Sequence, residues 1–245
     1  YLPGDQLAVF DIGDGSVRLI DIPNKKVTTL VPSGIVDGYN LVYWPKDKHL
    51  YISDQALGRV LRLDLKTKAL ETLFDKDARL TQPRALCVYQ DQIYVSDGKT
   101  ELVCVMDIRL DDNLGIKSAD LRQVTQKTGV VAMTVSDNCL YGLQTGNDPL
   151  VKLLPEIKPA RLATAWGFLM DNDSAAYAPF LSVDTNRPMG FAASPKEPRK
   201  FFLTERTTNT NSIVSVKDYD FEQDWGARSR ADSKKALSDF DYPAS

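Results

Sequence analysis

Short apolar stretches that each end in an acidic residue recur along the first half of the chain. The first acidic residue stands at positions 11, 54 and 97, and a second one ends the next apolar stretch at 21, 64 and 107. Both series are spaced 43 residues apart. A fixed period of this length is typical of folds that repeat one supersecondary unit.

Four short strands can be placed within one unit of the repeat. The predicted strands are Asn40–Trp44, Leu50–Ser53, Arg59–Leu65 and Ala69–Phe74, and the third alternates apolar and polar residues as a half-buried strand does. The turn Pro45–Lys48 separates the first strand from the second. Four antiparallel strands in about 40–45 residues predict a blade of an all-β protein, the β-propeller.

Later segments continue this pattern with looser spacing. Predicted first strands are Pro83–Tyr89, Val130–Val135 and Pro188–Ser194, and predicted second strands are Leu140–Gln144 and Phe201–Glu205. The interval between these second strands has room for a further pair, Arg161–Leu169 and Ala178–Val183. Five second strands favour five blades, with six possible, and no inner strand precedes Leu7 in the first blade.

The repeat divides the chain into two parts. Residues 1–220 carry the strand pattern, and we expect them to form the β-propeller. Residues 221–245 are polar and lack β-periodicity. We therefore expect residues 221–245 to be a C-terminal tail or the start of an interdomain linker.

Composition and charge limit the kinds of partner that we expect the chain to bind. The chain has 30 Lys and Arg against 33 Asp and Glu, a formal net charge of −3, which argues against nucleic-acid binding. No apolar run approaches the roughly 18 residues of a membrane span. The chain opens at Tyr1 without a signal-peptide pattern, as a mature form would, which slightly favours a secreted or periplasmic protein over a cytoplasmic one.

The unit from Leu50 to Asp64 resembles a blade of the NHL-repeat and senescence-marker-protein/gluconolactonase superfamily, and the segment from Pro83 to Asp97 is similar to the same blade. The resemblance covers residues 7–110 well and 130–220 loosely. It implies the propeller fold. It does not fix a function, because such propellers include lactonases, strictosidine-synthase-like proteins and binding modules.

The lactonase branch implies a divalent cation such as calcium, held by a first-blade glutamate, inner-strand asparagines and an aspartate. Asn40 lies where an inner-strand asparagine is expected, and Arg84 is taken as the equivalent residue of the next blade, where it would repel a metal. No glutamate precedes Glu71, so the first-blade ligand has no counterpart. Under this alternative Asn40 and Glu205 are the metal ligands, and in a strictosidine-synthase-like protein Glu205 is the candidate base.

The segment Asp239–Pro243 resembles the lead into an SGNH-type esterase domain of some bacterial multidomain proteins. This resemblance implies that the chain is one module of a larger protein, without the enzyme itself.

Few residues suit catalysis. His49, the only histidine, is expected to be a solvated turn residue, which excludes triad chemistry. The cysteines, Cys87, Cys104 and Cys139, are expected to be buried. Gly98-Lys99-Thr100 resembles the end of a phosphate-binding loop, but Ile93 stands where that loop requires glycine.

The aspartates that end the second strands are expected to accept backbone N–H groups across the following turn. This structural role is expected for Asp11, Asp54, Asp97 and Glu205.

The connections between blades, and those between second and third strands, are expected to share one face that is suited to a polar ligand. The candidate ligand-binding residues on it are Tyr39, Asn40, Arg84, Arg187, Glu205 and Arg206. We therefore predict a non-enzymatic propeller, with no catalytic residue and no cofactor, that binds a polar small molecule, a carbohydrate or a protein segment. A metal-dependent lactone hydrolase and a strictosidine-synthase-like protein are the alternatives.

Overall fold

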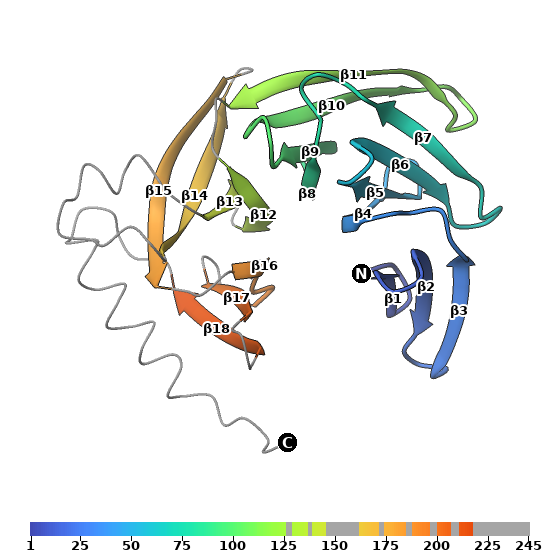
Figure 1. The fold of residues 1–245 in the computed structure, drawn as a ribbon, viewed down its shortest axis with the longest axis horizontal. Helices are drawn as coiled ribbons and strands as arrows, with labels where there is room; N and C mark the ends of the chain where they lie inside the picture. The colour runs from blue at the N-terminus through green and yellow to red at the C-terminus, as the bar shows by residue number, and fades with distance from the viewer. Residues whose placement is uncertain are drawn as a thin grey trace. The chain divides into compact units, whose positions relative to one another are not determined.

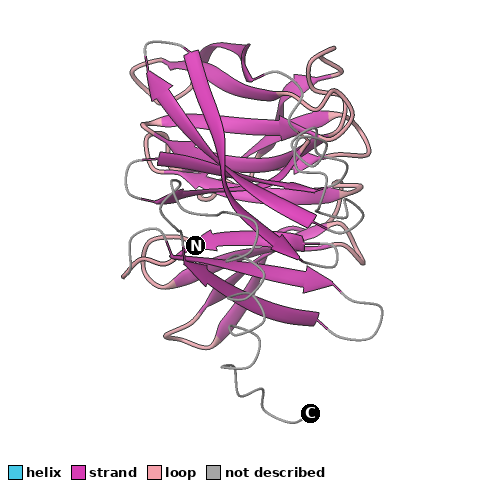
Figure 2. Ribbon diagram, turned by 90° about the vertical axis from the view of Figure 1, so that its left-hand side faces the viewer, coloured by secondary structure: helices cyan, strands magenta, loops and turns pink. Residues whose placement is uncertain are grey.

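The computed structural model describes residues 1–125, 129–136, 139–145, 162–171, 174–184, 188–196, 200–206 and 211–217. All regular structure within these ranges is β-strand, as the repeat predicts (Figure 2). The chain divides into two compact units, Tyr1–Gly129 and Val130–Ser245. Among the described residues no helix has the length and apolar character that a membrane crossing requires.

The first unit contains three antiparallel sheets (Figure 1). The first sheet has three strands in the order β1 (Gln6–Asp11), β2 (Ser16–Asp21) and β3 (Lys26–Val31). The second has four, β4 (Gly38–Trp44), β5 (His49–Asp54), β6 (Arg59–Asp64) and β7 (Leu70–Asp75). The third also has four, β8 (Pro83–Tyr89), β9 (Gln92–Asp97), β10 (Val103–Leu110) and β11 (Ile116–Thr125).

The second unit contains two further sheets. One has the order β12 (Val130–Ser136), β13 (Cys139–Thr145), β14 (Leu162–Asp171) and β15 (Ser174–Asp184). The other has β16 (Pro188–Ala193), β17 (Lys200–Arg206) and β18 (Asn211–Lys217). The strands β14 and β15 confirm the pair expected in the long interval of the sequence, although β14 begins one residue later than expected and β15 four residues earlier.

Each four-stranded sheet is the antiparallel meander of a propeller blade, so the described residues contain five blades or parts of blades. In the first sheet, β1 holds the second-strand position, and no inner strand precedes it in the described chain, as the sequence predicts. The C-terminal segment 221–245, with the motif Asp239–Pro243, lies outside the described residues.

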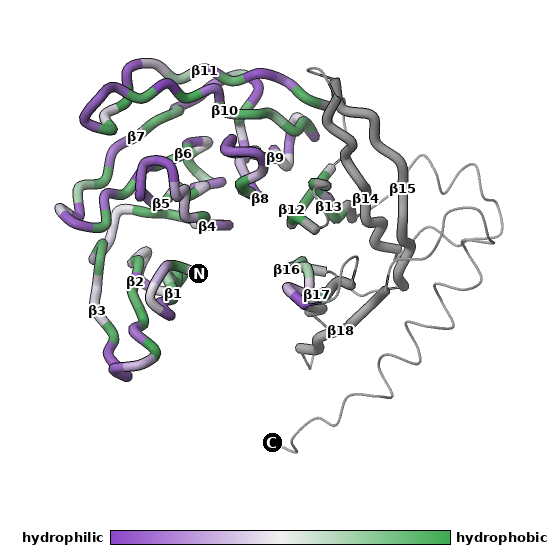
Figure 3. Tube along the Cα trace, turned by 180° about the vertical axis from the view of Figure 1, so that it is seen from behind, coloured by the Kyte–Doolittle hydropathy of each residue, from purple (hydrophilic) through white to green (hydrophobic). Residues whose placement is uncertain are grey.

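Two apolar clusters fill the first unit and explain why its central strands are buried on both faces. Leu50 and Ile52 of β5 pack with residues of the first sheet such as Val17. Tyr51, between them in sequence, packs with Ile93 of the third sheet. Alternate side chains of one strand therefore enter opposite clusters. Hydrophilic residues gather at turns, as between β2 and β3 (Figure 3).

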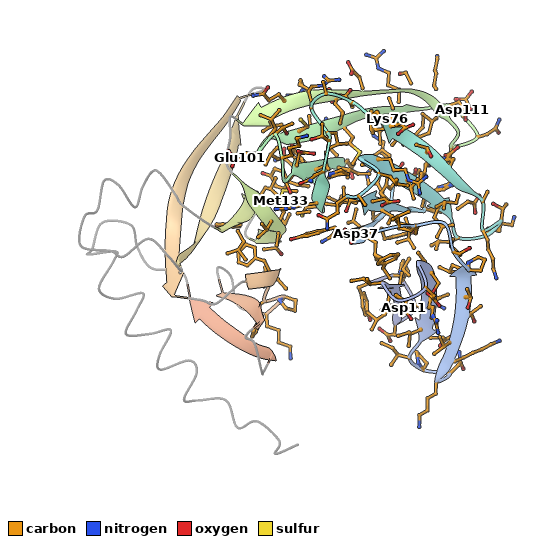
Figure 4. The ribbon with its side chains drawn as sticks, in the orientation of Figure 1. Asp11, Asp37, Lys76, Glu101, Asp111 and Met133 are labelled. Atoms are coloured by element: carbon orange, nitrogen blue, oxygen red, sulfur yellow. The ribbon has the colours of Figure 1, made fainter. Side chains whose placement is uncertain are left out.

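Antiparallel pairing sends the blade loops to two opposite edges of each sheet. We call one edge the upper face: it bears the connections between blades and the turns between second and third strands. The other edge, the lower face, bears the turns between first and second strands and between third and fourth strands. Asp37 lies directly before β4 (Figure 4), in the connection from the first sheet to the second, and so belongs to the upper face.

Candidate functional site

Two inner strands of the first unit, β4 and β8, begin on the upper face with the same local structure. Gly38 pairs with Asp54 and Pro83 pairs with Asp97, and each pairing is followed by a register shift. The backbone N–H of Asn40 then donates to Ser53 Oγ at 3.0 Å, and that of Ala85 donates to Ser96 Oγ at 3.0 Å. Asn40 and Ala85 are therefore equivalent residues.

This register corrects one interpretation of the sequence. Arg84 is not the equivalent of Asn40, because it occupies the position of Tyr39. The turn between β4 and β5 has four residues whereas that between β8 and β9 has two. Equivalent inner-strand residues are therefore spaced 45 apart, while the second strands keep the spacing of 43.

The aspartates at the ends of β5 and β9 hold the loops that enter the inner strands. Asp97, which is 1% exposed, accepts the backbone N–H groups of Lys99 at 2.9 Å and Thr100 at 2.7 Å, and also that of Gln82. The expected structural role across the following turn is thus confirmed for Asp97. Asp11 makes the same kind of bond to Gly13 N at 3.0 Å.

Asp54 departs from this expectation in the loop that it binds. It accepts N–H groups from the preceding connection between blades, those of Val36 at 3.2 Å and Asp37 at 3.1 Å. Arg59 Nη2 also donates to it at 2.9 Å. The Asp54 carboxylate is fully buried and occupied by these partners, so it is not available to a ligand.

Arg84 is the unusual residue of this face. Its side chain is half-buried, and its guanidinium carbon lies 5.8 Å from the centre of the Tyr39 ring. A Cβ added to Gly98 would clash with the Arg84 guanidinium, so the glycine leaves the room that this side chain occupies. Arg84 Nε is buried and has no hydrogen-bond partner among the described residues. We call Tyr39, Asn40, Arg84 and Gly98 the Arg84 site.

The surroundings keep the Arg84 site in place. Ser53 Oγ donates to the backbone carbonyl of Arg84 at 2.6 Å, which ties the second sheet to the third. Burial raises the pKa of Tyr39, while the charge of Arg84 opposes this, so the phenol is neutral at physiological pH. The nearby Asp37 accepts a hydrogen bond from Gln55 Nε2 at 2.8 Å and forms no ion pair with Arg84.

The predicted residues of the second unit are placed only in part. Glu205 pairs with Pro188 before a register shift, which is the position that Asp54 and Asp97 hold in their sheets. Arg206 follows it and pairs with Asn211. Arg187 lies outside the described residues.

The same register identifies the counterparts of Asn40 in the other blades. They are Ala85 in β8, Ala132 in β12 and Gly190 in β16, since each follows the register shift of its inner strand. None has a side-chain oxygen that could bind a cation. Within the described ranges no three His, Cys, Asp or Glu side chains are grouped as a metal site requires.

The lower face of the first unit carries a buried charged cluster that the sequence did not reveal. Asp47, with a fully buried side chain, accepts hydrogen bonds from Tyr51 Oη at 2.6 Å and Arg62 Nε at 2.9 Å. Arg62 also donates to Glu71 Oε1 at 2.5 Å and to the carbonyl of Leu114 at 2.7 Å. The prediction of a half-buried third strand is therefore wrong at Arg62, which is buried because it is paired.

His49 belongs to this cluster, and the expectation of a solvated turn residue is wrong. Its side chain is 15% exposed, its Nδ1 lies 2.6 Å from the carbonyl of Asp47, and its Nε2 lies 3.6 Å from Asp64 Oδ2. The residues next to the two ring nitrogens of His49 therefore all belong to the lower face. No described serine or cysteine forms a hydrogen bond with it, so no triad is seen in this part of the chain.

Two described cysteines, Cys87 and Cys104, are buried and unpaired, as expected. Burial raises the pKa of the Cys87 thiol to about 12 and that of Cys104 to about 11. Both thiols are therefore protonated and unreactive at neutral pH. The side chain of Cys139 lies outside the described residues.

Comparison with known proteins supports the fold. No protein-family model matches the sequence, and no curated protein matches it. A gluconolactonase from Xanthomonas campestris is similar in structure, with a TM-score of 0.63 and 15% identity over 87% of this chain and 69% of that chain. A virginiamycin B lyase from Staphylococcus aureus has a TM-score of 0.58 and 11% identity over 88% of this chain and 67% of that chain.

A structure of a nidogen/laminin complex contains a further similar chain, with a TM-score of 0.58 and 13% identity over 89% of this chain and 75% of that chain. At these identities the likeness concerns the fold alone. The chain has the β-propeller fold that its repeat predicts, and the structures that share this fold include a gluconolactonase.

Proposed function

We propose that this chain is a non-enzymatic propeller that binds a polar ligand or a segment of a partner protein at the Arg84 site. The observation that carries the proposal is the state of Arg84, a half-buried guanidinium without an acidic partner among the described residues. Burying a charge is unfavourable unless a partner offsets the loss of hydration. A ligand that supplies this partner would bind with a gain in free energy.

The other residues of the Arg84 site suit recognition. Asn40 offers an amide donor and acceptor, and Tyr39 offers an aromatic surface with a hydroxyl group. A few fixed polar groups beside an aromatic ring are typical of binding sites for small polar ligands and carbohydrates.

A metal-dependent lactonase is the second candidate, favoured by the position of Asn40 and by the fold of the gluconolactonase. It requires a divalent cation between Asn40 and Glu205. The counterparts of Asn40, Ala85, Ala132 and Gly190, weaken this candidate because they add no ligand. Glu205 weakens it too, because its register position is the one at which Asp54 and Asp97 bind backbone N–H groups.

Metal binding and turnover separate the two candidates. Metal-stripped protein is unfolded thermally with and without calcium, zinc or manganese, and lactone hydrolysis is measured in parallel. A cation at about 100 times its dissociation constant adds about 2.7 kcal/mol, which corresponds to a rise of about 5–10 °C in Tm. We expect no such rise and no turnover. A rise and a lactonase activity that Asn40→Ala abolishes would contradict the proposal.

Binding itself is tested with arrays of glycans and of peptides. The wild-type protein is compared with Tyr39→Ala, and with Tyr43→Ala as a control on the same strand, away from the upper face. We expect a ligand that the wild type and Tyr43→Ala retain and that Tyr39→Ala loses. Equal retention by all three would contradict a site at Tyr39.

The domain organisation remains part of this proposal. Residues 1–220 form the propeller, and residues 221–245 lead from it as a tail or linker, with Asp239–Pro243 as the link to a further domain.

A further inference from the structure

We propose that Arg84 receives a carboxylate of the ligand, held in the plane of its guanidinium group. This inference rests on the proposed binding function and deepens it, because it names the chemical group that the Arg84 site recognises.

The other partly buried arginines of the first unit show what this fold does with a guanidinium. Each forms a hydrogen bond with an acidic side chain: Arg18 with Asp14, Arg59 with Asp54, Arg62 with Asp47, Arg79 with Asp77 and Arg122 with Asp107. Arg84 has the ring of Tyr39 instead, and no ion pair with a described residue. An acidic partner for Arg84 therefore has to come from outside the described residues.

Gly98, a residue of the repeat, leaves the space that the Arg84 guanidinium occupies. Gly98 is the equivalent of Gln55, since each follows the acidic residue of its second strand and donates its backbone N–H to the residue before the inner strand. Those bonds are Gln55 N to Asp37 O at 3.0 Å and Gly98 N to Gln82 O at 2.8 Å. The side chain of Gln55 extends to Asp37, whereas the absence of one at Gly98 admits Arg84.

The packing fixes Arg84 before any ligand arrives. The ring centre of Tyr39 lies 5.8 Å from the guanidinium carbon, and Ser53 Oγ donates a hydrogen bond to the backbone carbonyl of Arg84. A group that is already ordered loses little conformational entropy on binding. The N–H groups of the guanidinium that these contacts leave open are the ones that can donate to a ligand.

A carboxylate matches this arrangement. It is planar, and it accepts two parallel hydrogen bonds from a guanidinium fork, which a single-point ligand cannot do. The acidic side chains closest in sequence to the Arg84 site already have partners. Asp37 accepts from Gln55, and Asp97 accepts from backbone N–H groups.

The experiment compares probes that differ only in the carboxylate. Gluconate is titrated against sorbitol, its neutral alcohol, and acetyl-Gly-Gly is titrated against its amide, with calorimetry as the readout. The first pair represents a sugar acid and the second the C-terminus of a peptide, so the two arms distinguish the sources. We expect one carboxylate to bind about tenfold or more tightly than its neutral counterpart.

Variants assign this preference to Arg84. Arg84→Gln should reduce carboxylate binding about tenfold or more, and Arg84→Lys should retain only part of it, because lysine keeps the charge without the fork. Arg109→Gln is the matched control, since Arg109 is exposed and its loss changes the net charge equally. Circular dichroism confirms that each variant is folded.

Three results would overturn the inference: sulfate binding as tightly as the carboxylate probes, no binding of either carboxylate probe at millimolar concentration, or equal losses in Arg84→Gln and Arg109→Gln. Sorbitol binding as tightly as gluconate, and lost in Tyr39→Ala, would overturn the carboxylate while leaving the proposed binding function intact.

Discussion

Replacing Asp47 by alanine removes the acceptor at the centre of the lower-face cluster. The variant loses the hydrogen bonds from Tyr51 Oη at 2.6 Å, Arg62 Nε at 2.9 Å and His49 N at 3.1 Å. It also leaves the Arg62 side chain, which is 7% exposed, without its buried counter-charge. Breaking a buried ion pair by removing one partner typically costs about 3–5 kcal/mol.

The lower end of that range applies here. Arg62 keeps Glu71 and the carbonyl of Leu114, so part of its charge remains compensated. We therefore expect Asp47→Ala to lower the free energy of unfolding by about 3 kcal/mol, and Tm by about 6–12 °C for a chain of this size.

Urea unfolding followed by tryptophan fluorescence measures this loss. Trp44 packs edge-on against Tyr51 with ring centres 5.8 Å apart, so its emission reports on the same cluster. Asp112→Ala is the control, because Asp112 is exposed. A loss below about 1 kcal/mol, or one equal to that of Asp112→Ala, would refute the view that this cluster stabilises the fold.

Three further predictions follow from the upper face and the core. Asp97→Ala should lower the free energy of unfolding, measured with urea, by about 2–3 kcal/mol, because it leaves the backbone N–H groups of Gln82 and Thr100 without their acceptor. Asp97→Asn should lower it by less, and equal losses in the two variants would contradict this role of Asp97. Gly98→Ala should change the free energy of unfolding by less than about 1 kcal/mol, because the new Cβ would meet only the end of a flexible side chain. A crystal structure of this variant should show Arg84 displaced, and an unmoved Arg84 would contradict its packing against Gly98. Cys87 should resist iodoacetamide at pH 8 and react on unfolding, because burial raises its pKa to about 12 and leaves almost no thiolate; rapid labelling of its peptide in the native protein, read by mass spectrometry, would contradict its burial.

The sequence was sufficient for the fold because the blade pattern is local. Apolar strands ending in Asp54 and Asp97 repeat at a fixed spacing, and the strand β8 was predicted with its observed bounds, Pro83–Tyr89. The role of Asp97 was predicted as well, since an acidic residue at a tight turn has nearby N–H groups to bind.

The residues of the site were harder to relate to one another. Tyr39, Asn40 and Arg84 were all predicted to lie on the binding face, but Arg84 was matched to Asn40 instead of Tyr39. The cause is the turn before β9, which is two residues shorter than the one before β5, so a single period cannot align both strands of a blade. The register shift in each inner strand adds a second offset that the hydrophobic pattern does not record.

The lower-face cluster and Gly98 depend on contacts between distant segments. Arg62 follows the alternation of an exposed position, and it is buried only because Asp47 and Glu71 lie beside it in space. Gly98 was noted only for a resemblance to a phosphate-binding loop, whereas its role is to admit a side chain from another strand.

Nuclear magnetic resonance of the Arg84 Nε–H group tests directly whether Arg84 binds the ligand. This group is buried and lacks a partner among the described residues, so its proton should give a distinct signal that Arg84→Lys removes. We expect the signal to shift during titration with a carboxylate probe and to stay in place with the neutral counterpart. A signal that does not move while the probe binds elsewhere on the protein would contradict it.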